Sequence, residues 1–496
     1  MNITRRTLLI GSLGTAGALT VGGLASRGRS SSAVGVASEA VRTAETTRRA
    51  TDQRVVTARL TPRAATIDLG GSTVQTWAYG ESVPGPLLRA SAGDLLRVSV
   101  ENSLPAETSV HWHGIALRND MDGVPGITQK PIGTGAAFTY EFTAPDPGTY
   151  FYHPHSGVQL DRGLYGVLVI DDPQEPGGYD NEWIVVLDDW IDGTGTTPDE
   201  VLKKLQARGA QSGGGMGGMG GSGGSGETMQ SPLLGGAGDI AYPHYLVNGR
   251  IAASPVTLSG KPGQRVRVRF INAGSDTAFR VALGGHQMTV THSDGYAVQP
   301  AVTDALVIGM GERFDVLVTL ADGAFPLVAS AEGKNGQGLA VVRTSPGAAA
   351  PAAGSTPAEL SGRVLLGTDL IAGAPTRLPD RAVDTTHDLV LGGSMGGYQW
   401  TLNGKRFPDT APLEVRQGQR VRLRFQNRTM MFHPMHVHGH TFALTAGGAR
   451  KDTVIVRPMQ QVEVDFQADN PGQWATHCHN IYHAESGMMT TISYRS

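Results

Sequence analysis

Cysteine is almost missing from this chain of 496 residues, which contains only Cys478. A single cysteine cannot form an internal disulfide, so its thiol is either an inert core side chain or part of the chemistry. Basic residues are not in excess either, since the net charge is −3. This charge balance does not indicate a nucleic acid as a partner. Beyond the N-terminal stretch, no segment is long and apolar enough to span a bilayer.

The composition that remains is that of ordinary globular domains. Hydrophobic residues make up 40% and charged residues 17%, which does not match a disordered chain. Glycine (68 residues) and proline (28 residues) are frequent, as in turn-rich all-β proteins. The length allows roughly three domains. Few segments favour a helix, and the best candidate is residues 198–205.

The N-terminus has the pattern of an export signal. Arg5 and Arg6 form a twin-arginine pair, and an apolar stretch broken by glycine follows to about Ala25. The stretch is short and rich in Gly and Ala, which favours a Tat-type signal over a transmembrane anchor. We therefore expect a periplasmic, cell-envelope or secreted protein, with the signal and a flexible segment occupying residues 1–50.

Three segments of the chain are similar to one another. Residues 93–102, 263–272 and 418–427 each alternate apolar and polar residues between a glycine turn and an asparagine, the pattern of a half-buried strand. Short segments ending in Asn-Gly, at 245–249 and 400–404, precede the second and third copies at similar distances. A repeat of this length predicts three related β-domains.

Domain boundaries follow from these repeats and from two low-complexity segments. We expect domain 1 at residues 51–175, domain 2 at 176–344 and domain 3 at 359–496, with a linker rich in Pro, Ala and Gly at 345–358. A Gly/Ser-rich tract at 212–229 contains methionines and is predicted to be a mobile loop of domain 2.

The three units differ in their histidines. Residues 147–155 of the first unit parallel residues 471–479 of the third, and both segments contain a His-x-His pair. The corresponding segment of the second unit, residues 325–330, contains no histidine. We therefore expect domains 1 and 3 to carry ligands and domain 2 to be a spacer.

Ten of the 15 histidines lie in four short clusters. Chance predicts about half of one His-x-His pair at this composition, so four pairs are not accidental. Residues i and i+2 of a strand point to the same face, so each pair aims two imidazoles in one direction. Eight such nitrogens suit a cluster of about three ions of copper, zinc, iron or nickel. The paired histidines are His111, His113, His153, His155, His436, His438, His477 and His479.

Cys478 then narrows the choice of metal. It stands between two of these histidines, so its side chain points to the opposite face of the strand. With His433, His483 and a weak axial Met488, it completes the ligand set of a blue-copper electron-transfer site. An electron that reaches this copper can leave through the backbone of Cys478 to the two flanking histidines.

These motifs resemble those of the three-domain multicopper oxidases, the family of laccases and bacterial cuprous oxidases. The resemblance extends from about residue 51 to residue 496, and all four copper-binding motifs stand in family order. It implies an all-β fold of three cupredoxin-like Greek-key β-sandwich domains. It also implies four copper ions, three of them in a cluster between domains 1 and 3 that reduces dioxygen to water.

The resemblance further implies which side chains hold each ion. A type 1 copper is expected at His433, Cys478, His483 and Met488, and a type 2 copper at His111 and His436. The type 3 pair is expected to use His113, His155 and His479 together with His153, His438 and His477.

Proton delivery is the other role that the resemblance suggests. Family members carry an acid nine positions after the His-Trp-His motif, and here that residue is Asp122, which can act as a general acid through water. A turn residue is the alternative, since Asp-Gly is a common turn signal. Relatives often have a second acid directly after the last type 1 histidine, but Ala484 stands there and Glu485 follows, so that route is unassigned.

The electron donor is open between two enzymatic alternatives. A cuprous oxidase is favoured because thioethers select Cu(I), although core filling also explains methionines. Cuprous oxidases share Met431 but carry an Asp where this chain has Thr429. A laccase acting on phenols and aromatic amines needs only an exposed type 1 edge. We favour Cu(I) as the physiological substrate. The methionines concerned are Met216, Met219, Met229, Met430 and Met431.

A copper-binding or storage protein without turnover is the alternative from a different class. Storage alone favours Met-, His- and Cys-rich tracts over four complementary strand motifs, so we expect an enzyme. A copper nitrite reductase is also disfavoured, because it lacks the full eight-histidine set on one chain. We expect a monomer that uses dioxygen and a small reducing substrate and keeps no membrane span once the signal is removed.

Overall fold

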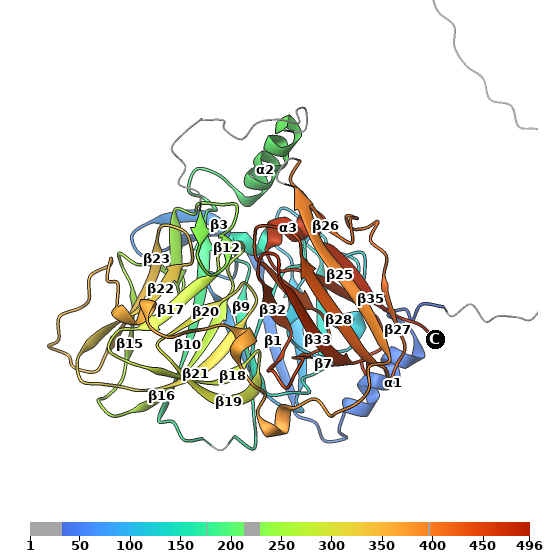
Figure 1. Cartoon of the computed structure of the whole chain (residues 1–496), viewed down its shortest axis with the longest axis horizontal. Coiled ribbons are helices and arrows are strands. Elements are labelled where there is room, and N and C mark those ends of the chain that lie inside the picture. Colours follow the sequence, from blue (N-terminus) through green and yellow to red (C-terminus); the bar gives the residue numbers. More distant parts are fainter. Residues whose placement is uncertain (1–31, 176, 213–228, 395–396) are drawn as a thin grey trace, which may run out of the picture. The chain divides into compact units, whose positions relative to one another are not determined.

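The computed structural model describes residues 32–175, 177–212, 229–394 and 397–496 (Figure 1). Residues 33–496 form one compact unit, built mainly from β-strands. The predicted twin-arginine signal lies outside the described residues, as does nearly all of the predicted loop at 212–229. Within the described ranges, no helix combines the length and the apolar character needed to cross a membrane.

The first region forms two sheets, of strand order β1-β5-β7 and β4-β9-β8-β6, and a ribbon of β2 and β3. Its strands are β1 (Val55–Leu60), β2 (Pro62–Asp68), β3 (Thr73–Tyr79), β4 (Gly85–Ser91), β5 (Leu95–Glu101), β6 (His111–His113), β7 (Ala137–Thr143), β8 (Gly148–His153) and β9 (Gly166–Asp171).

The second region forms a seven-stranded sheet, β14-β13-β10-β16-β21-β18-β19, a six-stranded sheet, β15-β23-β22-β17-β20-β24, and a ribbon of β11 and β12. Its strands are β10 (Asn181–Trp190), β11 (Gln230–Ser231), β12 (Gly235–Gly236), β13 (His244–Val247), β14 (Arg250–Ile251), β15 (Val256–Ser259), β16 (Arg265–Asn272), β17 (Phe279–Leu283), β18 (Met288–Ser293), β19 (Tyr296–Thr303), β20 (Ala305–Ile308), β21 (Arg313–Thr319), β22 (Ala324–Ala331), β23 (Gln337–Arg343) and β24 (Val364–Leu365).

The third region forms a six-stranded sheet, β26-β25-β28-β33-β30-β31, and a five-stranded sheet, β27-β35-β34-β29-β32. Its strands, orange to red in Figure 1, are β25 (Thr385–Ser394), β26 (Gln399–Leu402), β27 (Leu413–Val415), β28 (Arg420–Asn427), β29 (His433–Val437), β30 (Phe442–Leu444), β31 (Arg450–Lys451), β32 (Thr453–Val456), β33 (Gln461–Gln467), β34 (Gln473–Cys478) and β35 (Met489–Tyr494).

Helices are few in the described residues. The α-helices are α1 (Glu39–Arg48), α2 (Pro198–Ser212) and α3 (Ile481–Glu485), and the short 3-10 turns are η1 (Asn119–Met121), η2 (Gln159–Arg162), η3 (Ala358–Ser361), η4 (Gly367–Asp369) and η5 (Ala374–Thr376). The helix predicted at 198–205 is confirmed by α2 and extends beyond it. Strand β24 pairs with β20, so this part of the predicted third domain is attached to the sheet of the second region.

The predicted internal repeat has a direct structural counterpart. Strands β5, β16 and β28 each pair in parallel with an earlier strand of their own region and antiparallel with a later one. The asparagine that ends each copy is buried, and its side-chain amide donates to two backbone carbonyls while its oxygen accepts from the N–H two residues on. The same turn therefore follows all three strands. These asparagines are Asn102, Asn272 and Asn427.

The N-terminal segment differs from the prediction between residues 33 and 50, where a flexible chain was expected. Ser38 caps α1 by accepting a hydrogen bond from the N–H of Val41. Glu45 of α1 is buried and accepts hydrogen bonds from the N–H and the hydroxyl of Thr143. Arg48 donates to Asn470 of the third region. These tertiary contacts hold the segment against the sheets. The sequence of the segment alone does not predict them, because the partner residues are distant in the chain.

Replacing Glu45 with Gln tests this attachment. The buried carboxylate accepts from three side-chain or backbone donors, one of them Arg49. Its neutralisation should lower the free energy of unfolding by about 1.5–3 kcal/mol, the range for hydrogen bonds to a charged group. Urea unfolding of the metal-free protein measures the effect. The exposed Glu39 of the same helix is the control, and an equal loss in Glu39→Gln would mean that the contact contributes nothing specific.

Candidate metal centres

The histidines of the first region come from two paired strands. In the β6–β8 pair, His111 lies directly opposite His153, so the two side chains share a face of the sheet. His113 is two residues further along β6 and points to the same side. Trp112 is paired with Tyr152 on the other face, and both are buried in the hydrophobic core. The core residues thereby fix the direction in which the histidines point.

The histidines of the third region come from β29 and β34, which pair antiparallel. His436 lies opposite His477, and Met435 lies opposite Cys478. Because side chains alternate along a strand, the imidazoles of His436 and His477 are on one face and the thiol of Cys478 is on the other. This confirms the opposite orientation predicted for Cys478. Two separate groups of ligand atoms therefore lie on the two faces of one sheet.

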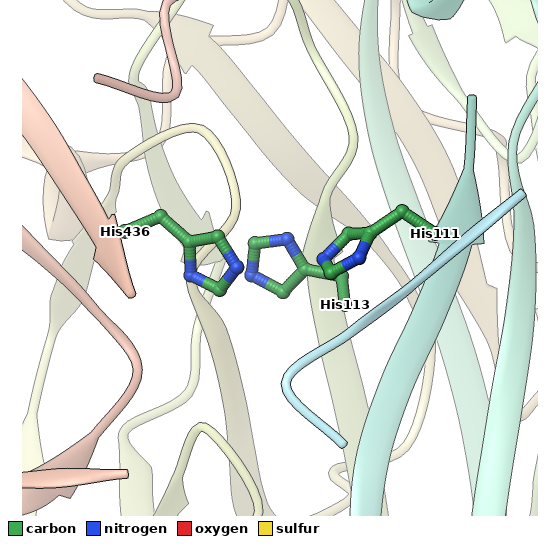
Figure 2. Close-up of side chains that lie close together, drawn as sticks. All are labelled: His111, His113 and His436. Carbon is green, nitrogen blue, oxygen red and sulfur yellow. The ribbon is translucent and has the colours of Figure 1, made fainter. Parts of the chain in front are cut away.

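The eight paired histidines, hereafter the histidine cage, meet where the first and third regions touch. The rings of His113 and His436 are stacked with centroids 3.8 Å apart, and those of His111 and His438 are stacked at 3.8 Å. Figure 2 shows His436 on one side and His111 and His113 on the other, with their ring nitrogens turned toward one another. The cage is thus assembled from residues more than 300 positions apart.

Within the cage, two groups of three ligand atoms match the predicted type 3 residues but divide them differently. One group is His113, His153 and His479, and the other is His155, His438 and His477; in each, the ligand atoms lie within 4.8 Å of one another. The predicted assignment of His153 and His155 is therefore exchanged. His153 ends β8 and stays beside the first-region sheet, whereas His155 lies past the end of the strand, next to His477.

The cage has the free nitrogens that metal ions require. Six buried ring nitrogens have no hydrogen-bond partner, and leaving such an atom unpaired costs about 1–3 kcal/mol. The Nε2 atoms of His438 and His477 face each other at 3.0 Å, and those of His155 and His477 at 3.3 Å. Two nitrogen lone pairs that face each other at these distances repel, and a cation bound between them removes the repulsion. The six nitrogens are His111 Nε2, His113 Nδ1, His153 Nε2, His436 Nε2 and both of His479.

The opposite nitrogens of the cage are held by hydrogen bonds that fix the tautomers. His111 Nδ1 donates to the carbonyl of Asp122 at 2.9 Å, and His436 Nδ1 donates to the carbonyl of Asp452 at 3.0 Å. The carboxylate of Asp122 accepts from His438 Nδ1 at 3.0 Å. Such outer partners orient metal-binding imidazoles and increase their basicity. Asp122, selected from the sequence, is therefore buried in contact with the cage.

Asp452 is a partner that the sequence analysis missed. Its Oδ1 lies 3.1 Å from His113 Nε2, and its two oxygens accept from Arg313 at 2.7 Å each, with every side chain of this group fully buried. Burial alone would raise the pKa of Asp452, but Arg313 and the bonds from His113 and His436 hold that pKa well below its ordinary value. No local motif marks Asp452, because its partners are distant in the chain.

Electrostatics keep the cage in the form that binds metal. Burial lowers the pKa of five of its imidazoles, and neighbouring histidines lower it further; these are His113, His153, His155, His438 and His479. For His477, burial and His436 bring the pKa to about 3, despite the hydrogen bond from its Nδ1 to the carbonyl of Cys478. Neutral imidazole is the ligand form, so the histidines are ready to bind at neutral pH.

A second group, hereafter the Cys478 site, consists of Cys478, His433 and His483. The sulphur of Cys478 lies 3.6 Å from His433 Nδ1 and 3.7 Å from His483 Nδ1, and the two nitrogens are 3.1 Å apart. All three side chains are buried. Burial raises the pKa of the thiol, so a cation must be bound for the thiolate to form. Two nitrogens and a sulphur suit copper.

Met488, the expected axial ligand, is placed beside this site by the backbone. The N–H of Cys478 donates to the carbonyl of Met488 at 3.1 Å, and the N–H of Met488 donates to the carbonyl of His483. Met488 is fully buried. Its position therefore agrees with the prediction, and ligation by its sulphur stays a prediction.

The outer nitrogens of the Cys478 site also have partners. The hydroxyl of Thr429 lies 2.8 Å from His433 Nε2. His483 Nε2 donates to Asp239 at 2.9 Å, and the same carboxylate oxygen accepts from the hydroxyl of Tyr398 at 2.6 Å. Asp239 belongs to the second region, as does Arg313. The second region is therefore not merely a spacer, as the sequence analysis expected, because Asp239 contacts His483 directly and Arg313 reaches His113 through Asp452.

A cavity of about 460 Å³ reaches the side of the cage. Its lining includes His155, which is only half-buried, together with Ala484, Glu485 and Asp199. Glu485, whose role the sequence left unassigned, thus lines the same cavity as a histidine of the cage.

Known families match all three regions. Three multicopper oxidase models cover residues 62–175, 181–347 and 381–496. The multicopper oxidase MmcO of Mycobacterium tuberculosis is 53% identical over 451 residues, which cover 89% of this chain and 87% of that protein. A copper resistance protein A homologue of Pseudomonas syringae is 31% identical, covering 86% of this chain and 90% of that protein.

Solved structures show the same fold. The chain superposes on Fet3p, described as a multicopper oxidase that functions in iron import, with a TM-score of 0.77 at 21% identity, covering 89% and 90% of the two chains. A laccase from Botrytis aclada gives a TM-score of 0.73 at 25% identity, covering 89% and 88%. The predicted fold of three cupredoxin-like domains is confirmed. This chain therefore belongs to the multicopper oxidases, a family of oxidoreductases that use dioxygen.

Proposed function

We propose that this protein oxidises Cu(I) and passes the electrons, one at a time, to dioxygen. The Cys478 site is assigned to a type 1 copper, and the histidine cage to a type 2 and two type 3 ions. His111 and His436 would hold the type 2 ion, and the two groups of three histidines the type 3 pair. Bound copper supplies one-electron transfer at the first site and four-electron reduction of dioxygen to water at the second.

The observation that carries this proposal is the placement of the two ligand groups on opposite faces of β34. Cys478 is covalently joined to His477 and His479, so a few bonds separate the two sites. A storage protein has no need of this connection. The chain thereby provides a route from a one-electron acceptor to a group of sites that accepts four electrons.

The choice of Cu(I) as substrate rests on the surroundings of the Cys478 site. His433 and His483 are both fully buried, and their outer nitrogens contact Thr429 and Asp239. In the described residues neither ring offers the exposed edge that an aromatic donor requires. A small cation held by thioethers at the surface needs no exposed ring edge, because its electron can pass to the histidines through hydrogen-bonded residues.

Methionines lie on the surface next to the Cys478 site. The β11–β12 ribbon crosses the segment before His433, where Gly236 donates to the carbonyl of Met430. Met430 is 73% exposed and Met459 is 62% exposed, although large apolar side chains are usually covered. Pro458, the neighbour of Met459, packs against Gly235 of the same ribbon. Thioethers select Cu(I), and Asp239 lies three residues beyond the ribbon.

The carboxylate that cuprous oxidases carry at position 429 is absent here, and Asp239 provides one from another part of the chain. Its buried side chain accepts from His483 directly. A negative charge at this point attracts a cation and strengthens the donor character of the imidazole. The substrate's electron therefore has a hydrogen-bonded contact, Asp239 to His483, through which it can enter the type 1 site.

A role in copper tolerance outside the cytoplasm follows as part of the proposal. The twin-arginine motif at Arg5 and Arg6 suits export of a folded metalloprotein. Relatives named copper resistance protein A support the same role. Oxidation of phenols and aromatic amines is the second candidate, supported by relatives named laccase.

Cys478→Ser tests the type 1 assignment. Removing the only thiolate should abolish the intense blue absorption and reduce substrate oxidation to background, while far-UV circular dichroism stays that of the wild type. Both are measured on the copper-loaded protein. Blue absorption that survives the substitution would refute the assignment.

The double variant Met430→Leu/Met459→Leu tests the substrate. Leucine keeps the volume but lacks the sulphur, so the KM for Cu(I) should rise about tenfold, equivalent to about 1.4 kcal/mol of binding. The KM for a phenol should stay constant. Oxygen uptake with each substrate measures both, and the phenol reaction of the same variant is the internal control. A parallel rise for the two substrates would exclude a specific Cu(I) role for these methionines.

Asp122→Asn tests the proton-delivery role of this carboxylate. The amide keeps the size of the side chain but cannot supply protons, so reoxidation by dioxygen should slow by roughly 100-fold, within the usual range for a general acid. Reduction of the type 1 site should change far less. Stopped-flow absorption separates the two steps, and equal slowing of both contradicts the role.

A further inference from the structure

Asp276 of the second region is a buried carboxylate that joins several segments around the Cys478 site. It follows β16 and has no exposed surface. Its Oδ1 accepts from Asn480 Nδ2 at 2.6 Å. The carboxylate also accepts from the backbone N–H groups of Asp239 and Ile240 at 3.0–3.1 Å, and from Lys334 Nζ at 2.6 Å. All four partners are donors, and only an acceptor-only group such as a carboxylate can satisfy them.

The first connection runs from Asp276 to the backbone of His483. Asn480 is the N-cap of α3, and its side-chain oxygen accepts from the N–H groups of Tyr482 and His483. The amide of the same side chain donates to Asp276. The N–H of Ile481 donates to the carbonyl of Ser275, the neighbour of Asp276, at 3.1 Å. The start of the helix that carries His483 is thereby fixed to the second region.

The second connection runs from Asp276 to the imidazole of the same histidine. Asp276 holds the backbone of Asp239, and the carboxylate of Asp239 accepts from His483 Nε2 at 2.9 Å. Backbone and ring of His483 are thus both tied to one carboxylate. This arrangement turns the Nδ1 of His483 toward Cys478, 3.7 Å from its sulphur.

Lys334 balances the charge of Asp276. Its Nζ is 2.6 Å from Oδ2 and also donates to the hydroxyl of Thr277 at 2.8 Å, with both side chains of the pair essentially unexposed. A buried ion pair is by itself weak evidence of a special role, because desolvation offsets much of its attraction. The Asp276–Lys334 pair differs because hydrogen bonds connect its carboxylate to His483 by two routes, one through Asn480 and one through Asp239.

We propose that Asp276 is a positioning residue, which sets the orientation of His483 at the type 1 site through Asn480 and Asp239. This inference rests on the copper assignment of the Cys478 site proposed above. The second region thereby controls the geometry of a metal site to which it contributes no ligand. Loss of this control should alter the copper signal itself and not only protein stability.

The experiment uses the copper-loaded full chain. The pair Asp276→Asn/Lys334→Gln removes both charges together, so that no unpaired buried charge remains. We expect a shifted blue absorption maximum, altered copper hyperfine splitting in the electron paramagnetic resonance spectrum, and release of type 1 copper to a chelator about tenfold faster, by analogy with other outer partners. Asn480→Ser keeps a capping oxygen but shortens the side chain, and should change the same signals in the same direction.

The control is Asp315→Asn. Asp315 is equally buried, in ion pairs with Arg267 and Arg269, but contacts neither Asn480 nor Asp239. The Asp315→Asn substitution should lower the thermal unfolding midpoint. The type 1 spectrum and the rate of copper release to the chelator should stay as in the wild type.

The outcomes separate the two proposals. A wild-type protein without blue absorption would overturn the copper assignment, and this inference with it. A blue wild type, together with Asp276→Asn/Lys334→Gln and Asn480→Ser proteins that keep its spectrum and chelator rate, would overturn only the positioning role. Should the double variant fail to fold, Asn480→Ser decides alone, because it leaves the Asp276–Lys334 pair intact.

Discussion

Alternation of side chains along β34 is the constraint from which the arrangement of both sites follows. The strand pairs with β29 so that Cys478 is opposite Met435 while His477 is opposite His436. One face of the sheet therefore receives the thiol, and the other receives imidazoles. A shift of one residue in this register would move every ligand to the wrong face. The hydrophobic core that fixes the register is thus also what separates the two metal sites and keeps them a few bonds apart.

The second region is free of paired histidines, yet it holds ligands of both sites in place. Arg313 binds Asp452, which contacts His113 of the cage, and Asp276 reaches His483 of the Cys478 site through Asp239. Physical necessity explains this dependence. Imidazoles buried around metal ions need outer partners to fix their tautomers, and carboxylates buried as partners need donors of their own. When these donors come from a different domain, the contact between the domains also positions the residues of the metal site.

The proposed choice of Cu(I) as substrate depends on what covers His433 and His483. Both rings are buried, and Thr429 stands where cuprous oxidases carry an acid. The structure supplies an equivalent charge from Asp239, which follows the ribbon that crosses Met430 and Met431. In the proposed Cu(I) oxidation, Asp239 takes the place of the acid that is missing at Thr429. In that proposal, the exposed thioethers of Met430 and Met459 favour a soft cation over an aromatic ring.

The sequence by itself determined the three β-domains, the histidines and cysteine of the two candidate metal sites and the opposite orientation of Cys478, because a period of two along a strand is a local property. The resemblance to multicopper oxidases also pointed to Asp122, nine residues after His113. Only the tertiary structure decided how His153 and His155 divide between the two groups and which distant carboxylates hold the ligands. It likewise ordered the segment that contains α1. The physical reason is that these features depend on side chains brought together from separate domains, and spacing along the chain carries no record of such contacts.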